Sequence, residues 1–550
     1  MAEALRHGSS PPPRARMTPQ KPPPPQAFRR PMASGDQFEA IRNRVNSLYG
    51  EFGQRPEEVQ QQREQPLEDL SKPTLKLLAP LFVVSVALGY TVGDVEAVNT
   101  LLVLGVLGVA YKLIWKYPPH VSLQGFLAIS LFLESSDEIP TWWQPPLRIA
   151  DIVYYGSIKE HTYIPGMSLP AFFLIALMLL FRSRRVAKKA GTLPPRITEI
   201  VMFAYLGAVF VVEAWGIARG GKITPSFFQI EYLFTMPVVA LGILYAIRGP
   251  EDFAGLGSVV VVVGASRAAL CIVTYVVVAS GFRDRDGFYV TTHSDTQLFV
   301  VSLVIMGLLA IERPKWRTLL WSVGVGLLIL GAIALNNRRI AFVTLGIFPI
   351  MMYRALPRSK LKRRLFTLGL VAAVLGAGYL ATAAAVQSES VVFKPARLVL
   401  SLAQQRDNSS ESRDVENFNL IYTLRTSPVL GQGFGHEYIE HLHLYDLSDV
   451  FPMYRYLPHN GVLWLWSVGG VVGFTGLWFV YVVAGTFILR ANRLARTMVE
   501  RIGTLTALSG VIAFVVQIWG DVGLNSFMGA IIFGLAYAIA VRMEWAVGRA

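Results

Sequence analysis

The chain has 550 residues, of which 53% are hydrophobic and 16% are charged, a more apolar composition than soluble globular proteins have. It predicts an all-α polytopic membrane protein and leaves no room for a second large soluble domain. The formal net charge is +14, but many basic residues gather in short loops between apolar segments, so we expect no nucleic-acid partner.

Residues 1–72 precede the apolar segments and are predicted to form a cytoplasmic tail. The tail is rich in proline up to about residue 34 and is expected to be disordered there, because such a sequence cannot bury a core. Over about residues 36–53, apolar side chains recur every three or four positions, which predicts an amphipathic helix. Such a helix lies on the inner membrane surface or docks a cytoplasmic partner.

Residues 73–550 are predicted to form the membrane domain, with about fourteen helices. Crossing the hydrocarbon takes about 20 apolar residues per helix. The expected spans are 74–92, 97–113, 120–134, 167–181, 197–217, 227–247, 255–281, 297–312, 318–336, 340–354, 365–385, 461–489, 503–520 and 526–541.

Four basic segments set the expected topology, namely residues 182–189, 313–317, 358–364 and 490–501. Cytoplasmic loops of membrane proteins are enriched in Lys and Arg. We therefore expect these segments and both termini in the cytoplasm, and the long loop 386–460 on the outer face.

Three ionisable residues stand inside apolar segments, where charges are costly and often functional. Glu213 and Glu231 fall near the outward ends of their spans. They either face a shared polar cavity, or pair with a buried Arg or cap a neighbouring helix. Arg267 falls near the middle of its span, in a structural ion pair or in contact with a lipid head group or diphosphate.

The outer loop 386–460 contains three separated polar motifs. Ser412-Arg413 begins a predicted helix, which continues over 414–426 with an apolar side formed by residues 415, 418, 420 and 421. A glycine-rich turn follows at 428–435. Its glycines either permit an unusual backbone conformation or present amides to a phosphate.

The third motif is Pro458-His459-Asn460, immediately before an apolar segment. Asn460 can cap the helix that follows, which alone would explain the pair. Histidine, however, is the side chain whose ordinary pKa lets it accept a proton near neutrality. His459 is therefore a candidate general base.

Further arginines are predicted on the same outer face. Arg283 and Arg285 stand in the loop 283–295, and Arg338 and Arg339 stand at a break between two spans. Outward arginines run against the usual charge bias of membrane loops, so a compensating anion is expected. A diphosphate fits, because the guanidinium fork matches phosphate oxygens.

The order of these motifs resembles the O-antigen ligase and polymerase family, whose members carry Ser-Arg, Pro-x-x-Gly-x-Gly-x-Gly and His-Asn in a periplasmic loop before a membrane helix. The resemblance covers roughly residues 257–476 and is strongest from Ser412 onward. The break at 336–339 resembles the Ser-Arg-Gly-Ala corner of the family, although Ile340 replaces the Gly. Residues 283–288 resemble its Arg-x-x-Gly-x-Phe element.

This resemblance implies a C-type membrane glycosyltransferase in the bacterial inner membrane. Such an enzyme moves a glycan from undecaprenyl diphosphate to an acceptor glycan at the periplasmic face, with inversion. The acceptor is the lipid A core for an O-antigen ligase and a lipid-linked repeat unit for an O-antigen or exopolysaccharide polymerase, and the sequence leaves both open. Membrane lipids and a chain-length regulator or other assembly protein are further candidate partners.

The implied site divides into three roles. His459 is the catalytic base, and the diphosphate ligands are Arg413, Arg338, Arg339, Arg285 and Arg283. Asn460, Ser412, Glu213 and Glu231 are in support. We expect no metal or other cofactor, since the loop histidines match no zinc spacing. The alternative is a transporter or flippase of the same lipid-linked sugars, but transporters place ionisable residues near the bilayer midplane.

Overall fold

The computed structural model describes residues 67–91, 96–134, 151–156, 169–277, 291–292, 294–335, 339–356, 359–386, 391–393, 395–397, 399–400, 408–443, 453–520, 524 and 526–549. All of them belong to one compact unit, Glu57–Ala550. The amphipathic helix predicted over 36–53 lies outside the described residues.

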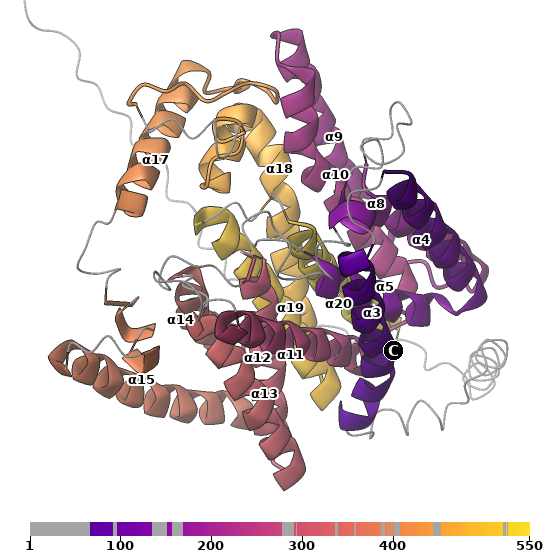
Figure 1. The fold of residues 1–550 in the computed structure, drawn as a ribbon, viewed down its shortest axis with the longest axis vertical. Coiled ribbons are helices and arrows are strands. Elements are labelled where there is room, and N and C mark those ends of the chain that lie inside the picture. The colour runs from indigo at the N-terminus through magenta and orange to yellow at the C-terminus, as the bar shows by residue number, and fades with distance from the viewer. Residues whose placement is uncertain are drawn as a thin grey trace, which may run out of the picture. The chain divides into compact units, whose positions relative to one another are not determined.

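The regular structure of the described residues is helical (Figure 1). The long helices are α3 (Leu67–Thr91), α4 (Glu96–Lys116), α5 (Pro119–Leu133), α8 (Ala171–Lys189), α9 (Arg196–Ala218), α10 (Ile223–Ala246), α11 (Phe253–Val277), α12 (Asp295–Glu312), α13 (Trp316–Leu335), α14 (Arg339–Ala355), α15 (Lys360–Val386), α17 (Asn408–Thr426), α18 (Gly461–Leu494), α19 (Met498–Gly520) and α20 (Phe527–Arg549). Short helical turns lie at Asp151–Tyr155, Pro250–Asp252 and Val391–Phe393.

Each of the fourteen predicted spans coincides with one of these helices. Among the described residues, eleven helices are long and apolar enough to cross a membrane. The three that fall short are α5, with 15 residues, α14, with 17, and α8, whose second half is basic. The chain is thus an all-α, multi-pass membrane protein.

Helices α10 and α20 lie in the interior of the unit. They pack against each other, and α20 also packs against α18 and α19. In the most apolar window of α20, 94% of the residues are buried, as expected for a helix that is apolar on every side. The corresponding share for α15 is 0%, so α15 lies at the periphery (Figure 1).

Polar contacts join the helix ends that carry the basic segments. Arg501 of α19 forms an ion pair with Glu312 at the end of α12 (2.9 Å). Arg364 of α15 donates to the carbonyl of Ile311 (2.9 Å). Arg542 of α20 donates to carbonyls in the last turn of α10 and in the α8–α9 connection (2.9 and 2.7 Å). Arg490 of α18 pairs with Glu544 of α20 (2.7 Å), which joins these two sets of contacts. The four basic segments therefore share one face, which we call the basic face.

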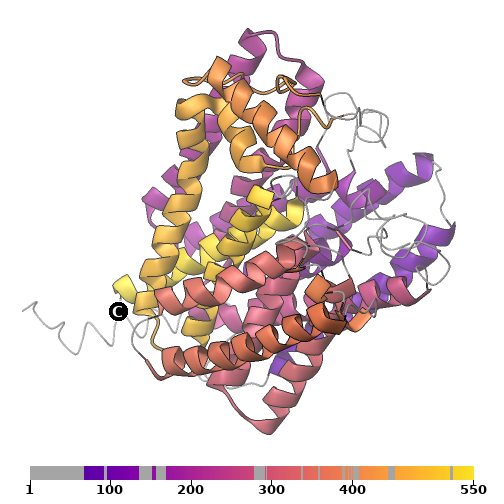
Figure 2. The same ribbon diagram turned by 90° about the vertical axis from the view of Figure 1, so that its left-hand side faces the viewer.

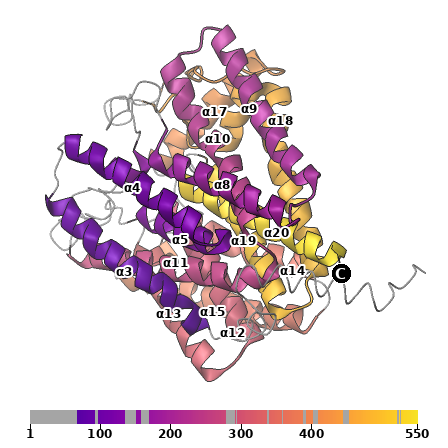
Figure 3. The same cartoon turned by 90° about the vertical axis from the view of Figure 1, so that its right-hand side faces the viewer.

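The opposite helix ends form the site face. There, Ser294 before α12 and Ser526 before α20 share a hydrogen bond (2.6 Å). Gln229 near the start of α10 donates to the carbonyl of Tyr456 in the long loop (2.7 Å). Figures 2 and 3 show α17 at the same end of the unit as the α9–α10 hairpin, with α13 reaching the other end. The described parts of the long loop thus fold against the membrane helices.

Helix α18 is broken at Gly470, where φ is 55° and ψ is −162°, a conformation that favours glycine. The amides of Val471 and Val472 donate instead to the carbonyls of Pro428 and Val429, at 2.9 and 3.1 Å. A turn of the long loop therefore completes the hydrogen bonding of a membrane helix. This matters because hydrocarbon offers a free amide no partner.

Candidate active site at the site face

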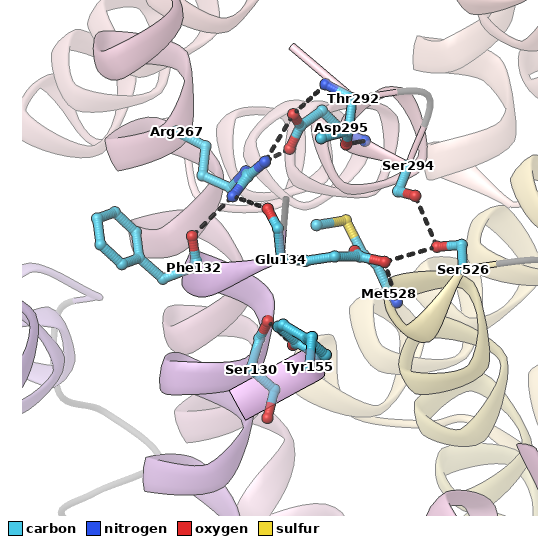
Figure 4. A network of polar contacts seen from close by, with 10 residues as sticks. All are labelled: Ser130, Phe132, Glu134, Tyr155, Arg267, Thr292, Ser294, Asp295, Ser526 and Met528. Carbon is cyan, nitrogen blue, oxygen red and sulfur yellow. Dashed lines mark hydrogen bonds and ion pairs between the residues drawn. The ribbon is translucent and has the colours of Figure 1, made fainter. Parts of the chain in front are cut away.

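One polar cluster, the Arg267 cluster, lies where α5, α11, α12 and α20 meet (Figure 4). Arg267 of α11 forms a two-pronged ion pair with Asp295 of α12, with Nη2 and Oδ2 2.8 Å apart. Its Nη1 donates to the carbonyls of Phe132 and Glu134, each at 2.7 Å. The side chains of Arg267 and Asp295 are only 3% and 1% exposed. This is the structural ion pair, the first of the two alternatives for Arg267.

Glu134 extends the cluster to α20. Its Oε1 accepts hydrogen bonds from the hydroxyl of Ser526 and the amide of Met528, both at 3.0 Å. Asp295 also accepts the amide of Thr292 (2.9 Å), at the start of α12. Buried charges persist when they are paired and hydrogen-bonded, so the cluster holds the ends of α5, α12 and α20 against the middle of α11.

The two acidic residues predicted near the outward ends of α9 and α10 lie on adjacent helices. Glu213 is 8% exposed and accepts a hydrogen bond from the hydroxyl of Ser226 on α10. Glu231 is half-buried, and its carbonyl accepts from Thr235 of the same helix (2.7 Å). Glu213 thus ties α9 to α10. A contact of either carboxylate with a substrate stays a prediction.

The glycine-rich turn is inserted between the α9–α10 connection and the break in α18. Gly433 has a φ of 83°, and a Cβ there would overlap the backbone of Gly216 at the end of α9. The carbonyl of Gly435 accepts the amide of Lys222 (2.9 Å). The amide of Gly435 donates to Gln229 (2.6 Å). Only a chain without side chains at these points can approach α9 so closely.

The amides of this turn are used within the protein. Gly431, Gln432 and Gly433 donate to the carbonyls of Ser427, Ser467 and Val468 at 3.0, 3.1 and 2.8 Å, respectively. The glycines therefore serve backbone conformation and close packing, rather than the presentation of these amides to a phosphate.

Helix α17 turns polar side chains toward the rest of the loop. Its buried positions include Glu416, Asn419 and Thr423, whereas Phe418 and Ile421 are 44% and 39% exposed. Of the predicted apolar side, Leu420 is buried, whereas Phe418 and Ile421 are exposed. The residues at 416, 419 and 423 follow helical spacing and form one continuous stripe.

The stripe is buried because the neighbouring loop segment has irregular backbone that needs partners. The side-chain oxygen of Asn419 accepts the amides of His441 and Leu442 at 3.0 and 2.8 Å. Thr423 accepts the amide of Ile439 at 2.8 Å. Polar side chains thus anchor α17 where an apolar face would leave amides unpaired.

Glu416 and His459 form the second cluster, the Glu416–His459 pair. The carboxylate accepts the backbone amide of His459 (3.1 Å) and lies 3.2 and 3.3 Å from the ring nitrogen Nδ1. The side chain of Glu416 is 7% exposed and that of His459 is 44% exposed. Burial, with a smaller contribution from the charge of Glu416, raises the pKa of neighbouring Tyr438. The imidazole is therefore contacted by a buried carboxylate, while nearly half of the His459 side chain remains accessible to solvent.

The residues on either side of this pair have defined places. Asn460 accepts the amide of Leu463 (3.1 Å) and caps α18. Arg413 is exposed and lies three residues before Glu416 on α17, so their Cβ atoms are about 5–6 Å apart. Ser412, which is half-buried, precedes it. His459 contacts Glu416, and Arg413 lies one turn before Glu416 on α17. His459 therefore lies next to the part of α17 that carries Arg413.

The other predicted arginines are only partly described. Arg339 is half-buried at the first position of α14. Ile340, the next residue, lies against Gly520 at the end of α19. Gly461 at the start of α18 lies against Ile518, which also belongs to α19. Arg339 and the start of α18 therefore flank the end of α19. Arg338, Arg283 and Arg285 lie outside the described residues.

Residues 324–478, from α13 to α18, match a family model described as O-Antigen ligase. This segment of the chain is thus similar to the O-antigen ligase family. Arg413, Glu416 and His459 all lie within the matched O-antigen ligase segment. No curated protein matched the chain. Together with the spanning helices, this family match supports a membrane enzyme that ligates glycans.

Within the part of the chain that the structure describes, no group of three or more His, Cys, Asp or Glu side chains is placed to hold a metal.

Glu416 was not among the site residues predicted from the sequence. One signal was present, since Glu416 stands three residues after Arg413 and therefore on the same side of a predicted helix. Its burial and its contact with a residue 43 positions later have no local signature in a single sequence.

Proposed function

We propose that this protein transfers a glycan from undecaprenyl diphosphate to an acceptor glycan, with inversion and without a metal. The site face is periplasmic in this proposal, and the basic face and both termini are cytoplasmic. The observation that carries it is the Glu416–His459 pair. It places a half-exposed imidazole beside the helix that bears Arg413, inside the family-matched segment.

The proposed reaction needs one base and a charge clamp. The acceptor hydroxyl oxygen forms a bond to the anomeric carbon, and the bond from that carbon to the diphosphate oxygen breaks. The hydroxyl proton passes to His459, and the lipid diphosphate leaves with the electron pair of the broken bond. A diphosphate is a good leaving group when its charge is stabilised, which is the role proposed for Arg413 and Arg339. His459 then returns its proton to water.

The acceptor stays open between two classes. A ligase would use the lipid A core, and a polymerase would use a lipid-linked repeat unit. Both require a glycan hydroxyl beside His459, so the same chemistry serves either acceptor. Glu213 and Glu231 are proposed only as support of the α9–α10 hairpin, on which the glycine-rich turn docks.

The test is transfer in liposomes that contain the purified full-length protein. A lipid-diphosphate-linked oligosaccharide is supplied with either acceptor, and glycan transfer and free lipid diphosphate are measured together. We expect equal amounts of transferred glycan and released lipid diphosphate with one of the two acceptors. Movement of the intact donor across the bilayer without release would support the transporter alternative and overturn the proposal.

A further inference from the structure

The ring of His459 has two nitrogens in different surroundings. Nδ1 lies 3.2 Å from Oε2 of Glu416 and 3.3 Å from Oε1. An ionised carboxylate only accepts hydrogen bonds, so the proton of a neutral imidazole must sit on Nδ1 to satisfy this contact. Nε2, which has no hydrogen bond within the described residues, then carries the lone pair that a base needs.

The same carboxylate also fixes where the ring stands. It accepts the backbone amide of His459 (3.1 Å) while it faces the ring, so one side chain holds both the main chain and the side chain of the same residue. The position of Glu416 is fixed in turn, because Asn419 and Thr423, which follow it on α17, accept hydrogen bonds from the loop backbone. On the other side, Asn460 anchors His459 to the start of α18.

We infer that Glu416 is a positioning residue, which holds His459 in the tautomer that leaves Nε2 free to accept the acceptor proton. This inference rests on the proposed function. A buried acidic side chain could also serve only as a tie between α17 and α18. The two roles can be separated with a glutamine at this position, because its amide group can replace the carboxylate as a tie between the helices but not as an acceptor of the Nδ1 proton.

The Glu416→Gln variant separates these roles. Glutamine has nearly the same size, and its carbonyl oxygen can still accept the His459 amide, so a tie between the helices survives. Its NH₂ group, however, can donate to Nδ1 and favours the tautomer that carries the proton on Nε2. We expect turnover to fall by at least about tenfold with an unchanged KM. When another enzyme loses the carboxylate that orients its catalytic His, the loss reaches about 10⁴-fold.

The control is Asp414→Asn. Asp414 is exposed on the same helix, two residues away, so the variant removes the same charge without touching the ring. Its turnover should equal that of the wild-type protein. A wild-type rate in Glu416→Gln, or equal losses in the two variants, would overturn the inference.

A spectroscopic measurement tests the tautomer without any activity. In ¹⁵N-histidine protein, the signals that disappear in His459→Ala identify the ring nitrogens of His459. The wild-type protein should show Nδ1 protonated and Nε2 unprotonated above the pH of ring protonation, and Glu416→Gln should shift this toward the opposite tautomer. A wild-type ring with its proton on Nε2 would refute the inference even if the Gln variant failed to fold. Failure of the wild-type transfer assay would instead reject the proposed function.

Discussion

The two polar clusters of the site face use the same kinds of groups in opposite ways. The Arg267 cluster is closed, because Arg267 donates four hydrogen bonds to protein acceptors and is 3% exposed. The Glu416–His459 pair is half open, because its acid is buried and its base is 44% exposed. Both clusters place ionisable groups next to apolar helices. Only the second leaves a reactive atom available.

The difference shows that an ionisable residue near apolar helices is a guide to function only after its contacts are counted. Charge in such surroundings is costly, and both clusters offset that cost with hydrogen bonds. In the Arg267 cluster, the donors of Arg267 bind acceptors within the protein. In the Glu416–His459 pair, the carboxylate is hydrogen-bonded to His459, and one ring nitrogen of His459 stays available.

The largest expected effect is on the open cluster. Replacing His459 by Ala removes the proton acceptor, so turnover should fall by roughly two to four decades, while the thermal stability in detergent stays near that of the wild-type protein. His443→Ala is the matched control, because that side chain is exposed on the same loop. Normal transfer by a correctly inserted His459→Ala protein would reduce the His-Asn motif to a helix cap.

The closed cluster should respond in stability. Arg267→Met leaves Asp295 buried without its partner, which typically costs about 3–5 kcal/mol. Unfolding of the purified protein in detergent measures the loss. Arg490→Met is the control for the same substitution, since Arg490 pairs with Glu544 at a site where it is 62% exposed, and exposed pairs contribute about 0–1 kcal/mol. Equal losses in the two variants would mean that the Arg267 cluster does not hold the helix ends.

A smaller effect is expected for Arg413→Lys. Lysine keeps the charge but loses the fork that binds two phosphate oxygens at once. Hydrogen bonds to charged groups contribute about 1.5–3 kcal/mol, so we expect kcat/KM to fall about 10- to 100-fold, with both KM and kcat affected. Arg425→Lys, exposed near the end of the same helix, should show wild-type kinetics. An unchanged kcat/KM in Arg413→Lys would remove Arg413 from the diphosphate site.

The smallest expected effect is that of a chelator. If guanidinium groups supply the counter-charge of the diphosphate, excess chelator should leave the transfer rate unchanged. Strong inhibition that added magnesium or manganese reverses would contradict this, and would return Glu213 and Glu231 to consideration as ligands.

The fold followed from the sequence more completely than the site did. Every predicted span is a helix, because the need to satisfy backbone groups in hydrocarbon leaves helices as the solution for such segments. The boundary at Asp295 and the break before Arg339 were also visible as polar interruptions. Local apolar composition is enough for these features.

The site depends on contacts between distant segments, which composition does not encode. His459 and Arg413 could be selected because their chemistry is unusual in its place. The position of Glu416 on the same side of the helix as Arg413 was not enough to select it, since one more acidic residue in a polar helix looks like a solvated one. The same limit applies to Phe418 and Ile421, whose exposure follows from a buried polar stripe on α17 that contacts irregular backbone.

The break at Gly470 bears on the order in which the protein is assembled. The carbonyls that receive the amides of Val471 and Val472 belong to Pro428 and Val429, and the turn that carries them rests on Gly216 of α9. All of these partners precede the break in the chain, so they are already synthesised when α18 emerges from the ribosome. Because free amides are costly in hydrocarbon, the broken form of α18 depends on the docked glycine-rich turn for these hydrogen bonds, so the folding of the loop and the settling of α18 are coupled.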